Sequence, residues 1–160
     1  MPYVDRDPVT GRITDEFGNP QREGHEFLAP DAFEFQQKAK RNAIDAAYVA
    51  AVARGWPYGQ GDAIQIGEAH RINISGLGAN AGFFLASVPG FTWPAGGQFL
   101  RTSKDVNLYL TPQQFVVIAM GVRECWSNIR ERYAALKDAC AAAQNLADLA
   151  AIDPVAGWPN

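Results

Sequence analysis

The sequence predicts an α+β protein with an N-terminal β-hairpin arm, a helical body that contains a small β-hairpin, and a long C-terminal helix. Three observations predict this class. Residues 31–54 and 113–150 are rich in alanine and contain no proline, which favours helices. Residues 1–30 and 91–110 carry short apolar segments between glycines and prolines, which is typical of strands and turns. With 48% hydrophobic and 19% charged residues, disorder throughout the chain is excluded.

The order of these regions divides the 160 residues into an acidic arm (1–30), a helical domain (31–153) and a C-terminal tail (154–160). The net charge is −3 and the isoelectric point is near 5.3, which disfavours a nucleic-acid partner. No apolar stretch reaches the roughly 18 residues of a membrane span. Because residues 1–12 lack the features of a signal peptide, we expect synthesis in the cytoplasm.

The arm contains two strand candidates, Tyr3–Arg6 and Arg12–Thr14. Between them, Pro8 favours a turn and Gly11 can adopt the positive φ that closes it. An isolated hairpin is only marginally stable in water, so the arm should need another surface.

The first helix is predicted over Ala32–Arg54, with Asp31 as N-cap and Glu34 completing a capping box. Gly55 and the proline two residues later should end it. We expect the second half of this helix to be the buried half, through the apolar residues Ile44, Ala47, Tyr48, Ala51 and Val52.

The middle of the chain predicts a short strand at Ala63–Ile66 and a second helix over His70–Leu85. The three glycines within Gly76–Gly82 lack the spacing of a dinucleotide-binding loop, so close helix packing explains them better. The candidate buried face of this helix consists of Ile72, Leu77, Ala81, Phe84 and Leu85.

A β region follows at about 91–110. It begins at Phe91–Trp93, and Gln98–Thr102 should pair with Val106–Leu110 in a hairpin. Phe99 and Arg101 should share one face of this hairpin, because side chains alternate along a strand.

The last helix is predicted over about 112–150. Thr111 and Gln114 form a capping box and Pro112 suits the first helical position. Apolar residues then recur in two rows at a seven-residue period, and we call these rows the heptad seam. One row is Phe115, Val122, Ile129, Leu136, Ala143 and Ala150; the other is Ala119, Trp126, Tyr133, Cys140 and Ala147.

This pattern leaves two interpretations open: packing against the first helix, or contact with a second copy or a partner helix. A helix of about 55 Å exceeds what a compact domain of this size needs, so we expect some intermolecular contact and a homo-oligomer. Tryptophans close to proline are typical interface anchors. The candidate partner-binding residues are Phe115, Val122, Trp126, Ile129, Tyr133, Leu136 and Trp158.

Catalytic and metal-binding patterns are not found in the sequence. His25 and His70 lack neighbours at metal-ligand spacing. Cys125 and Cys140 would lie about 22 Å apart on one helix, too far for a disulfide. We therefore expect no enzymatic activity, no cofactor and no metal.

Several short motifs together resemble a known family. The opening residues Met1–Asp7, with Gly11–Ile13, Gly18–Gln21 and Glu26–Leu28, resemble the start of short tail proteins of tailed bacteriophages. The later motifs are similar to a domain of unknown function in proteins encoded beside phage tail fibres, and the chain's ending is like that of tail-fibre assembly proteins. These motifs are Ile64–Ile66, His70–Ile74, Phe99–Asp105, Leu110–Phe115 and, at the end of the chain, Ala151–Pro154 and Trp158–Pro159.

The resemblance implies a non-enzymatic phage tail protein. We expect it to bind a tail-fibre or baseplate protein, to assist fibre assembly or attachment, and to remain in the tail of the virion. The alternative is a purely structural component of the baseplate or tail fibre, in the host-attachment apparatus, that acts as no chaperone. The resemblance implies no nucleic-acid or membrane partner.

Overall fold

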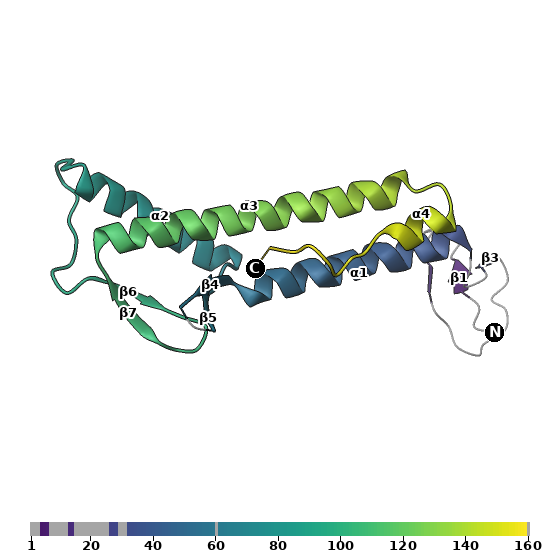
Figure 1. Cartoon of the computed structure of the whole chain (residues 1–160), viewed down its shortest axis with the longest axis horizontal. Helices are drawn as coiled ribbons and strands as arrows, with labels where there is room; N and C mark the ends of the chain where they lie inside the picture. Colours follow the sequence, from purple (N-terminus) through teal and green to yellow (C-terminus); the bar gives the residue numbers. More distant parts are fainter. Residues whose placement is uncertain (1–3, 7–12, 15–25, 29–31, 60, 160) are drawn as a thin grey trace. The chain divides into compact units, whose positions relative to one another are not determined.

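The structure is a computed structural model that describes residues 4–6, 13–14, 26–28, 32–59 and 61–159 (Figure 1). It confirms the α+β class: the described elements comprise helices, short antiparallel strands and a long helix near the C-terminus. In chain order these elements are β1 (Val4–Arg6), β2 (Ile13–Thr14), β3 (Glu26–Leu28), α1 (Phe33–Arg54), β4 (Trp56–Tyr58), β5 (Asp62–Ile64), α2 (Glu68–Leu85), β6 (Gln98–Arg101), β7 (Asn107–Leu110), α3 (Pro112–Ala142) and α4 (Leu146–Ala151).

The chain forms two compact units, each built from segments that are distant in sequence. The first unit comprises Met1–Asp45 and Ala135–Pro154, and the second comprises Ala46–Ala134 and Val155–Asn160. Residues of α1 and α3 therefore belong to both units. The two units are described separately below.

In the first unit, the arm forms a small sheet of order β2-β1-β3 in which both pairings are antiparallel. The pairing of Asp5 with Thr14 confirms the predicted hairpin. The third strand, β3, adds pairs such as Val4 with Leu28 and was not predicted. The predicted turn at Asp7–Gly11 and the predicted N-cap Asp31 lie outside the described residues.

The rest of the first unit joins α1 to the end of α3 and to α4 through polar contacts. Gln37 Nε2 donates to the Cys140 carbonyl at 2.9 Å, and Lys40 Nζ donates to the Ile152 carbonyl at 2.8 Å. Figure 1 shows α4 beside the first turns of α1. These bonds satisfy carbonyl groups at the end of one helix and just after another, positions where helices leave carbonyls without internal partners.

The prediction that the last helix continues to residue 150 is wrong, because α3 ends at Ala142 and the separate helix α4 follows. A capping box marks the start of α4. Asn145 Oδ1 accepts from the Asp148 amide at 2.9 Å, and Asp148 Oδ2 accepts from the Gln144 amide at 2.9 Å. The heptad seam therefore runs along one helix only as far as Cys140.

In the second unit, α1 ends just before Gly55, whose φ of +75° favours glycine. Here β4 and β5 form an antiparallel hairpin that pairs Trp56 with Ile64. The strand predicted at Ala63–Ile66 corresponds to β5. The strand β4 was not predicted, because Gly55 and Pro57 predict only the end of the first helix. Pro57 is tolerated because β4 pairs with β5 alone in this two-stranded sheet.

Helix α2 crosses the first half of α3 (Figure 1). A Cβ built on Gly78 would lie 2.5 Å from the Ala119 Cβ, so this glycine permits a close helix contact, as predicted. The predicted buried face is wrong in part: Ile72, Phe84 and Leu85 are exposed, whereas Ile74 and Ala81 are buried. The close approach at Gly78 selects this other side of α2.

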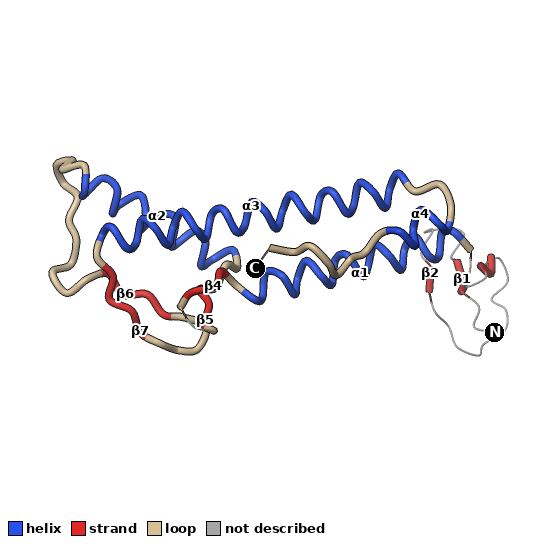
Figure 2. Tube along the Cα trace, in the orientation of Figure 1, coloured by secondary structure: helices blue, strands red, loops and turns tan. Residues whose placement is uncertain are grey.

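The hairpin predicted at 98–110 is confirmed as β6 and β7, which pair Phe99 with Tyr109 (Figure 2). Thr102 is buried and its Oγ1 accepts from the Val106 amide at 3.1 Å, which closes the turn. Phe91–Trp93 is not a strand. Instead Trp93 Nε1 donates to the Leu110 carbonyl at 3.0 Å from an irregular segment.

The start of α3 confirms the predicted capping box. The Thr111 amide donates to Gln114 Oε1 at 2.9 Å, and the Gln114 amide donates to Thr111 Oγ1 at 3.3 Å. This local signal places α3 directly after β7.

Candidate binding surfaces

The first row of the heptad seam is buried within the chain itself from Phe115 to Leu136. Phe115, Val122 and Ile129 belong to the core of the second unit, and Leu136 is buried in the first. Seven residues make about two helical turns, so the row stays on one side of α3.

The second row is only half-buried until it reaches Cys140, which is buried. Ala119 and Trp126 are half-buried, whereas Ile118 and Cys125 are buried. Helix α3 therefore presents a wider apolar face than the narrow seam of a two-stranded coiled coil, as a helix in a globular core does.

Three aromatic rings surround the ring of Tyr48 in the second unit. The centroid of the Tyr48 ring lies 4.5 Å from that of Tyr133, 6.2 Å from that of Trp126 and 6.5 Å from that of Trp158. Tilted pairs at these distances contribute about 0.5–1.5 kcal/mol each beyond the area they bury. The cluster thus brings together residues from α1, α3 and the C-terminal segment.

Two arginines hold this cluster in place. The Arg71 guanidinium lies 3.5 Å from the centroid of the Trp126 ring, and its Nε donates to the Ile66 carbonyl at 3.1 Å. Arg132 Nη2 donates to the Ala156 carbonyl at 2.9 Å, next to buried Trp158. The C-terminal segment is therefore docked onto its own unit.

The structure thus places the predicted partner-binding residues in the cores of the two units. Phe115, Val122, Ile129, Leu136 and Trp158 are buried, and Trp126 and Tyr133 are half-buried. That they bind a partner stays a prediction. Intrachain packing, one of the two interpretations of the seam, accounts for their burial.

Both cysteines are buried free thiols on α3, as expected. Burial raises the pKa of Cys125, and the charge of Arg54 partly opposes this shift. The thiol rather than the thiolate is therefore the dominant form at neutral pH, which makes Cys125 a poor nucleophile.

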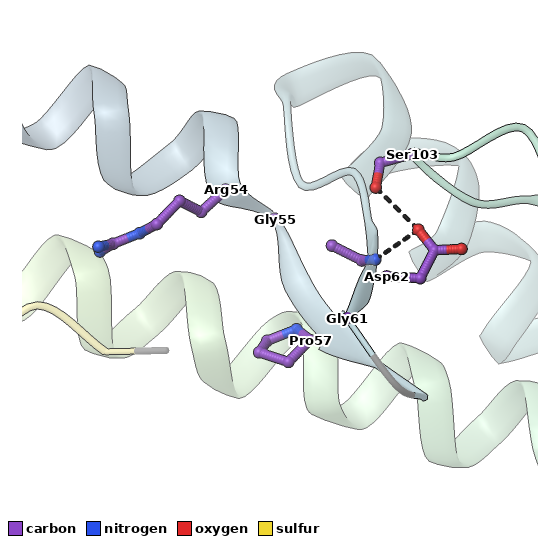
Figure 3. Close-up of a pocket in the computed structure, with 7 residues that line it drawn as sticks. Arg54, Gly55, Pro57, Gly61, Asp62 and Ser103 are labelled. Carbon is purple, nitrogen blue, oxygen red and sulfur yellow. Dashed lines mark hydrogen bonds between the residues drawn. The ribbon is translucent and has the colours of Figure 1, made fainter.

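A shallow pocket of about 260 Å³ lies where the two hairpins of the second unit meet (Figure 3). Its acidic side chain, Asp62, connects the hairpins. Asp62 Oδ1 accepts from the Ala63 amide at 2.7 Å, from Ser103 Oγ at 2.9 Å and from the Lys104 amide at 3.2 Å. The residues that line the pocket are Arg54, Gly55, Pro57, Gly61, Asp62, Ala63 and Ser103.

These contacts stabilise the ionised form of the Asp62 carboxylate and use it as a hydrogen-bond acceptor. Hydrogen bonding lowers the pKa of Asp62, with the largest effect from the Thr102 side chain. Figure 3 shows the Arg54 side chain extending away from this carboxylate. The carboxylate serves as a hydrogen-bond acceptor between two hairpins, which is a structural role.

In the first unit, a second hollow of about 240 Å³ lies between α1 and α4, lined by Gln36, Lys40, Leu146, Leu149 and Ala150. Among the described residues, no three His, Cys, Asp or Glu side chains gather as metal ligands do. Of the two histidines, His70 is exposed and His25 lies outside the described residues.

The outward face of the β6–β7 hairpin carries an exposed aromatic pair. Phe99 and Tyr109 are directly paired across the strands, are 46% and 66% exposed, and have ring centroids 5.9 Å apart. Leu100 and Leu110 point to the other, more buried face. We call Phe99 and Tyr109 the hairpin pair. The predicted alternation of this strand located Phe99, but sequence reasoning did not identify the pair as a surface.

A second exposed apolar region lies in a segment of the chain that contains no charged residue. Residues 72–100 contain no Asp, Glu, Lys or Arg, and 82–92 are all exposed. Apart from Phe99 of the hairpin pair, the exposed large apolar side chains within this stretch are Ile72, Phe83, Phe84, Leu85, Val88 and Phe91. The long interval without charge is the sequence signal that could have located this surface.

Residues 35–156 match the model of a protein family described as a domain of unknown function (DUF4376). No curated protein and no solved structure matches the chain. Within the described part of the chain, none of the helices has the length and apolar composition that crossing a membrane requires.

Proposed function

The chain belongs to the DUF4376 family, which is defined by a domain of unknown function, and we propose that it is a bacteriophage tail protein that binds a tail-fibre protein. In this proposal it assists the assembly or attachment of the fibre, performs no catalysis and remains in the tail of the virion. The sequence resemblance described above supports the phage context. The observation that carries the binding role is the exposed hairpin pair.

The hairpin pair has the properties of a protein contact. Exposed aromatic side chains bury a large apolar area with few rotatable bonds when a partner covers them, which is why Tyr and Trp dominate binding hot spots. Among the described residues, β6 and β7 pair only with each other, so their outer edges suit the addition of a strand from a fibre protein. The proposed contact therefore combines an aromatic face with main-chain pairing.

The heptad seam is a less suitable contact in this proposal. Phe115 and Ile129 are 0% exposed, so a partner could reach them only after the chain opened. Polar substitutions at such positions would unfold the chain whether or not it binds a fibre. An informative test must use exposed residues.

The test is co-expression with the tail-fibre protein encoded by the neighbouring gene. The double variant Phe99→Ser/Tyr109→Ser should fold, because both side chains are exposed, and should lose co-purification with the fibre protein. The matched control is Val49→Ser, which removes a 64% exposed apolar side chain from α1 and should bind normally. Unchanged binding by the double variant would contradict the role of the hairpin pair.

Mass spectrometry of purified virions separates the proposed role from its alternative. A fixed number of copies per particle, combined with unchanged fibre folding when the gene is deleted, supports a purely structural component of the tail. Misfolded fibres after deletion support the proposed assembly role. Absence from finished particles would contradict the proposed location in the virion.

A further inference from the structure

Four residues on α2 form a row that faces away from the core, and we call them the α2 outer row. They are Ile72, Gly76, Ala79 and Phe83. Their spacings of four, three and four positions place them on one side of the helix. The buried residues Ile74 and Ala81 lie on the opposite side.

The α2 outer row is apolar and uncovered. Ile72 is 66% exposed and Phe83 is 48% exposed, and a Cβ built on Gly76 would meet nothing within 4 Å. At 1.5 Å per residue, Ile72 and Phe83 stand about 16 Å apart. The row therefore has a large apolar residue at each end and a hollow over the two small residues between them.

Exposed apolar residues continue past Phe83 to the end of the helix and beyond. The ring centroids of Phe83 and Phe91 lie 4.7 Å apart, and Phe84, Leu85 and Val88 are exposed nearby. If a whole aromatic side chain counts as about 150–250 Å², these residues and the row expose on the order of 500 Å². This total is similar to the largest apolar patch on a typical monomer, which is often a functional surface.

We propose that the α2 outer row is a homodimer contact, in which α2 packs antiparallel against α2 of a second copy. Along the helix, the two-fold axis lies level with the midpoint of the row, between positions Leu77 and Gly78. The side chains of the row are, in order, large, small, small and large, and this order is the same in both directions along the helix. An axis at this point therefore places Ile72 opposite Phe83 of the second copy, and Gly76 opposite Ala79 of the second copy.

The charge pattern favours a second copy as the occupant. A two-fold contact brings identical surfaces together, so a central charge on one copy would meet a like charge on the other. Residues 72–100 contain no charged side chain, so pairing two copies of α2 would bury no charge from this segment. Small residues at the centre allow two helix backbones to approach closely, and antiparallel helix dipoles attract each other.

The first experiment is sedimentation of the full chain between about 1 and 100 µM, the range expected for a modest interface. The unaltered chain should shift from monomer to dimer over this range. Ala79→Glu should weaken dimerisation about 100-fold or more, because two buried like charges would face each other near the axis. Val49→Glu places the same charge at an exposed position on α1 and should leave dimerisation unchanged. Circular dichroism checks that both variants fold.

A second experiment tests the antiparallel arrangement. Ile72→Cys and Phe83→Cys are prepared as separate full chains and oxidised alone or mixed. The mixture should form a disulfide-linked dimer, because Ile72 faces Phe83 of the second copy. Neither variant alone should do so, because each residue lies about 16 Å along the helix from the same residue of the second copy. A parallel, in-register pair would instead link each variant to itself.

Several outcomes would overturn the proposal: a monomer at every concentration, a dimer as tight after Ala79→Glu, or self-linking of the single cysteine variants. If the chain is monomeric and Ala79→Glu loses the neighbouring tail-fibre protein, that protein occupies this surface and the homodimer is wrong. This inference does not depend on the proposed function, because Phe99→Ser/Tyr109→Ser tests fibre binding on a different surface.

Discussion

Two valines on α3 provide a matched test of whether the heptad seam is the core of a single chain. Val122 is 2% exposed, whereas Val117 is 63% exposed. Each loses two methyl groups when it is replaced by alanine, and each change raises helix propensity by about the same 0.5 kcal/mol. The difference between the two variants therefore isolates the contribution of burial.

The expected size of that difference follows from the packing of Val122. Removing two buried carbons costs about 1.6 kcal/mol in transfer free energy. The cavity that remains adds up to about 1 kcal/mol, at roughly 24 cal/mol per Å³. After the gain in helix propensity, Val122→Ala should lower the free energy of unfolding by about 1–2 kcal/mol, whereas Val117→Ala should raise it by about 0.5 kcal/mol.

Urea denaturation followed by circular dichroism at several protein concentrations measures both effects. If the seam is intrachain, the loss in Val122→Ala is the same at every concentration. A loss that grows in more concentrated samples would mean that the seam is also an intermolecular contact. Equal stability of the two variants would refute the reasoning, because Val122 would then not be a core residue.

Three further predictions concern two glycines, the two cysteines and Asp62. Gly121→Ala should lower the melting temperature, because the added Cβ would lie 2.6 Å from Trp56 Cε2. Gly82→Ala adds a Cβ that meets nothing within 4 Å, so it should raise the free energy of unfolding by about 0.5–1 kcal/mol. Thermal denaturation of the two variants compares these effects. Cys125 and Cys140 should resist a thiol reagent at pH 8 in the folded chain and react fully in urea, since both are buried and the pKa of Cys125 is raised; rapid labelling of the folded chain would contradict this. Asp62→Asn should lower the melting temperature at pH 7, because the carboxylate accepts bonds from both hairpins. The pKa of Asp62 is lowered on folding from 3.8, so its contribution is complete above that pH and is lost as the pH falls through the lower folded value, where the two melting temperatures should converge.

Local signals in the sequence predicted the fold best. The capping box of Thr111 and Gln114 located the start of α3, and the alternation around Phe99 gave the correct faces of β6. Both signals act over a few residues, so they do not depend on how distant segments pack. The capping box of Asn145 and Asp148 is equally local, but the alanine-rich heptad pattern around it suggested a continuous helix.

Elements that depend on tertiary contacts were harder to predict. The burial of Ile74 instead of Ile72 follows from the close approach of Gly78 to Ala119, which no local pattern of α2 reveals. The strand β4 forms around Pro57 because Trp56 pairs with Ile64 and its indole lies against Gly121. In both cases a distant small residue decides which side of an element is buried.

A seven-residue apolar period has the same form whether a helix packs on its own chain or on another one. The two cases differ in whether the buried side chains find neighbours within the chain. On α3 they do: Phe115 meets Trp93 with ring centroids 5.7 Å apart, and Tyr133 meets Tyr48. The row from Ile72 to Phe83 on α2 stays largely exposed, although Phe83 meets Phe91, and it carries no charge that would favour water. Contacts with other proteins are therefore expected on α2 and on the hairpin pair rather than on the helix with the stronger heptad pattern.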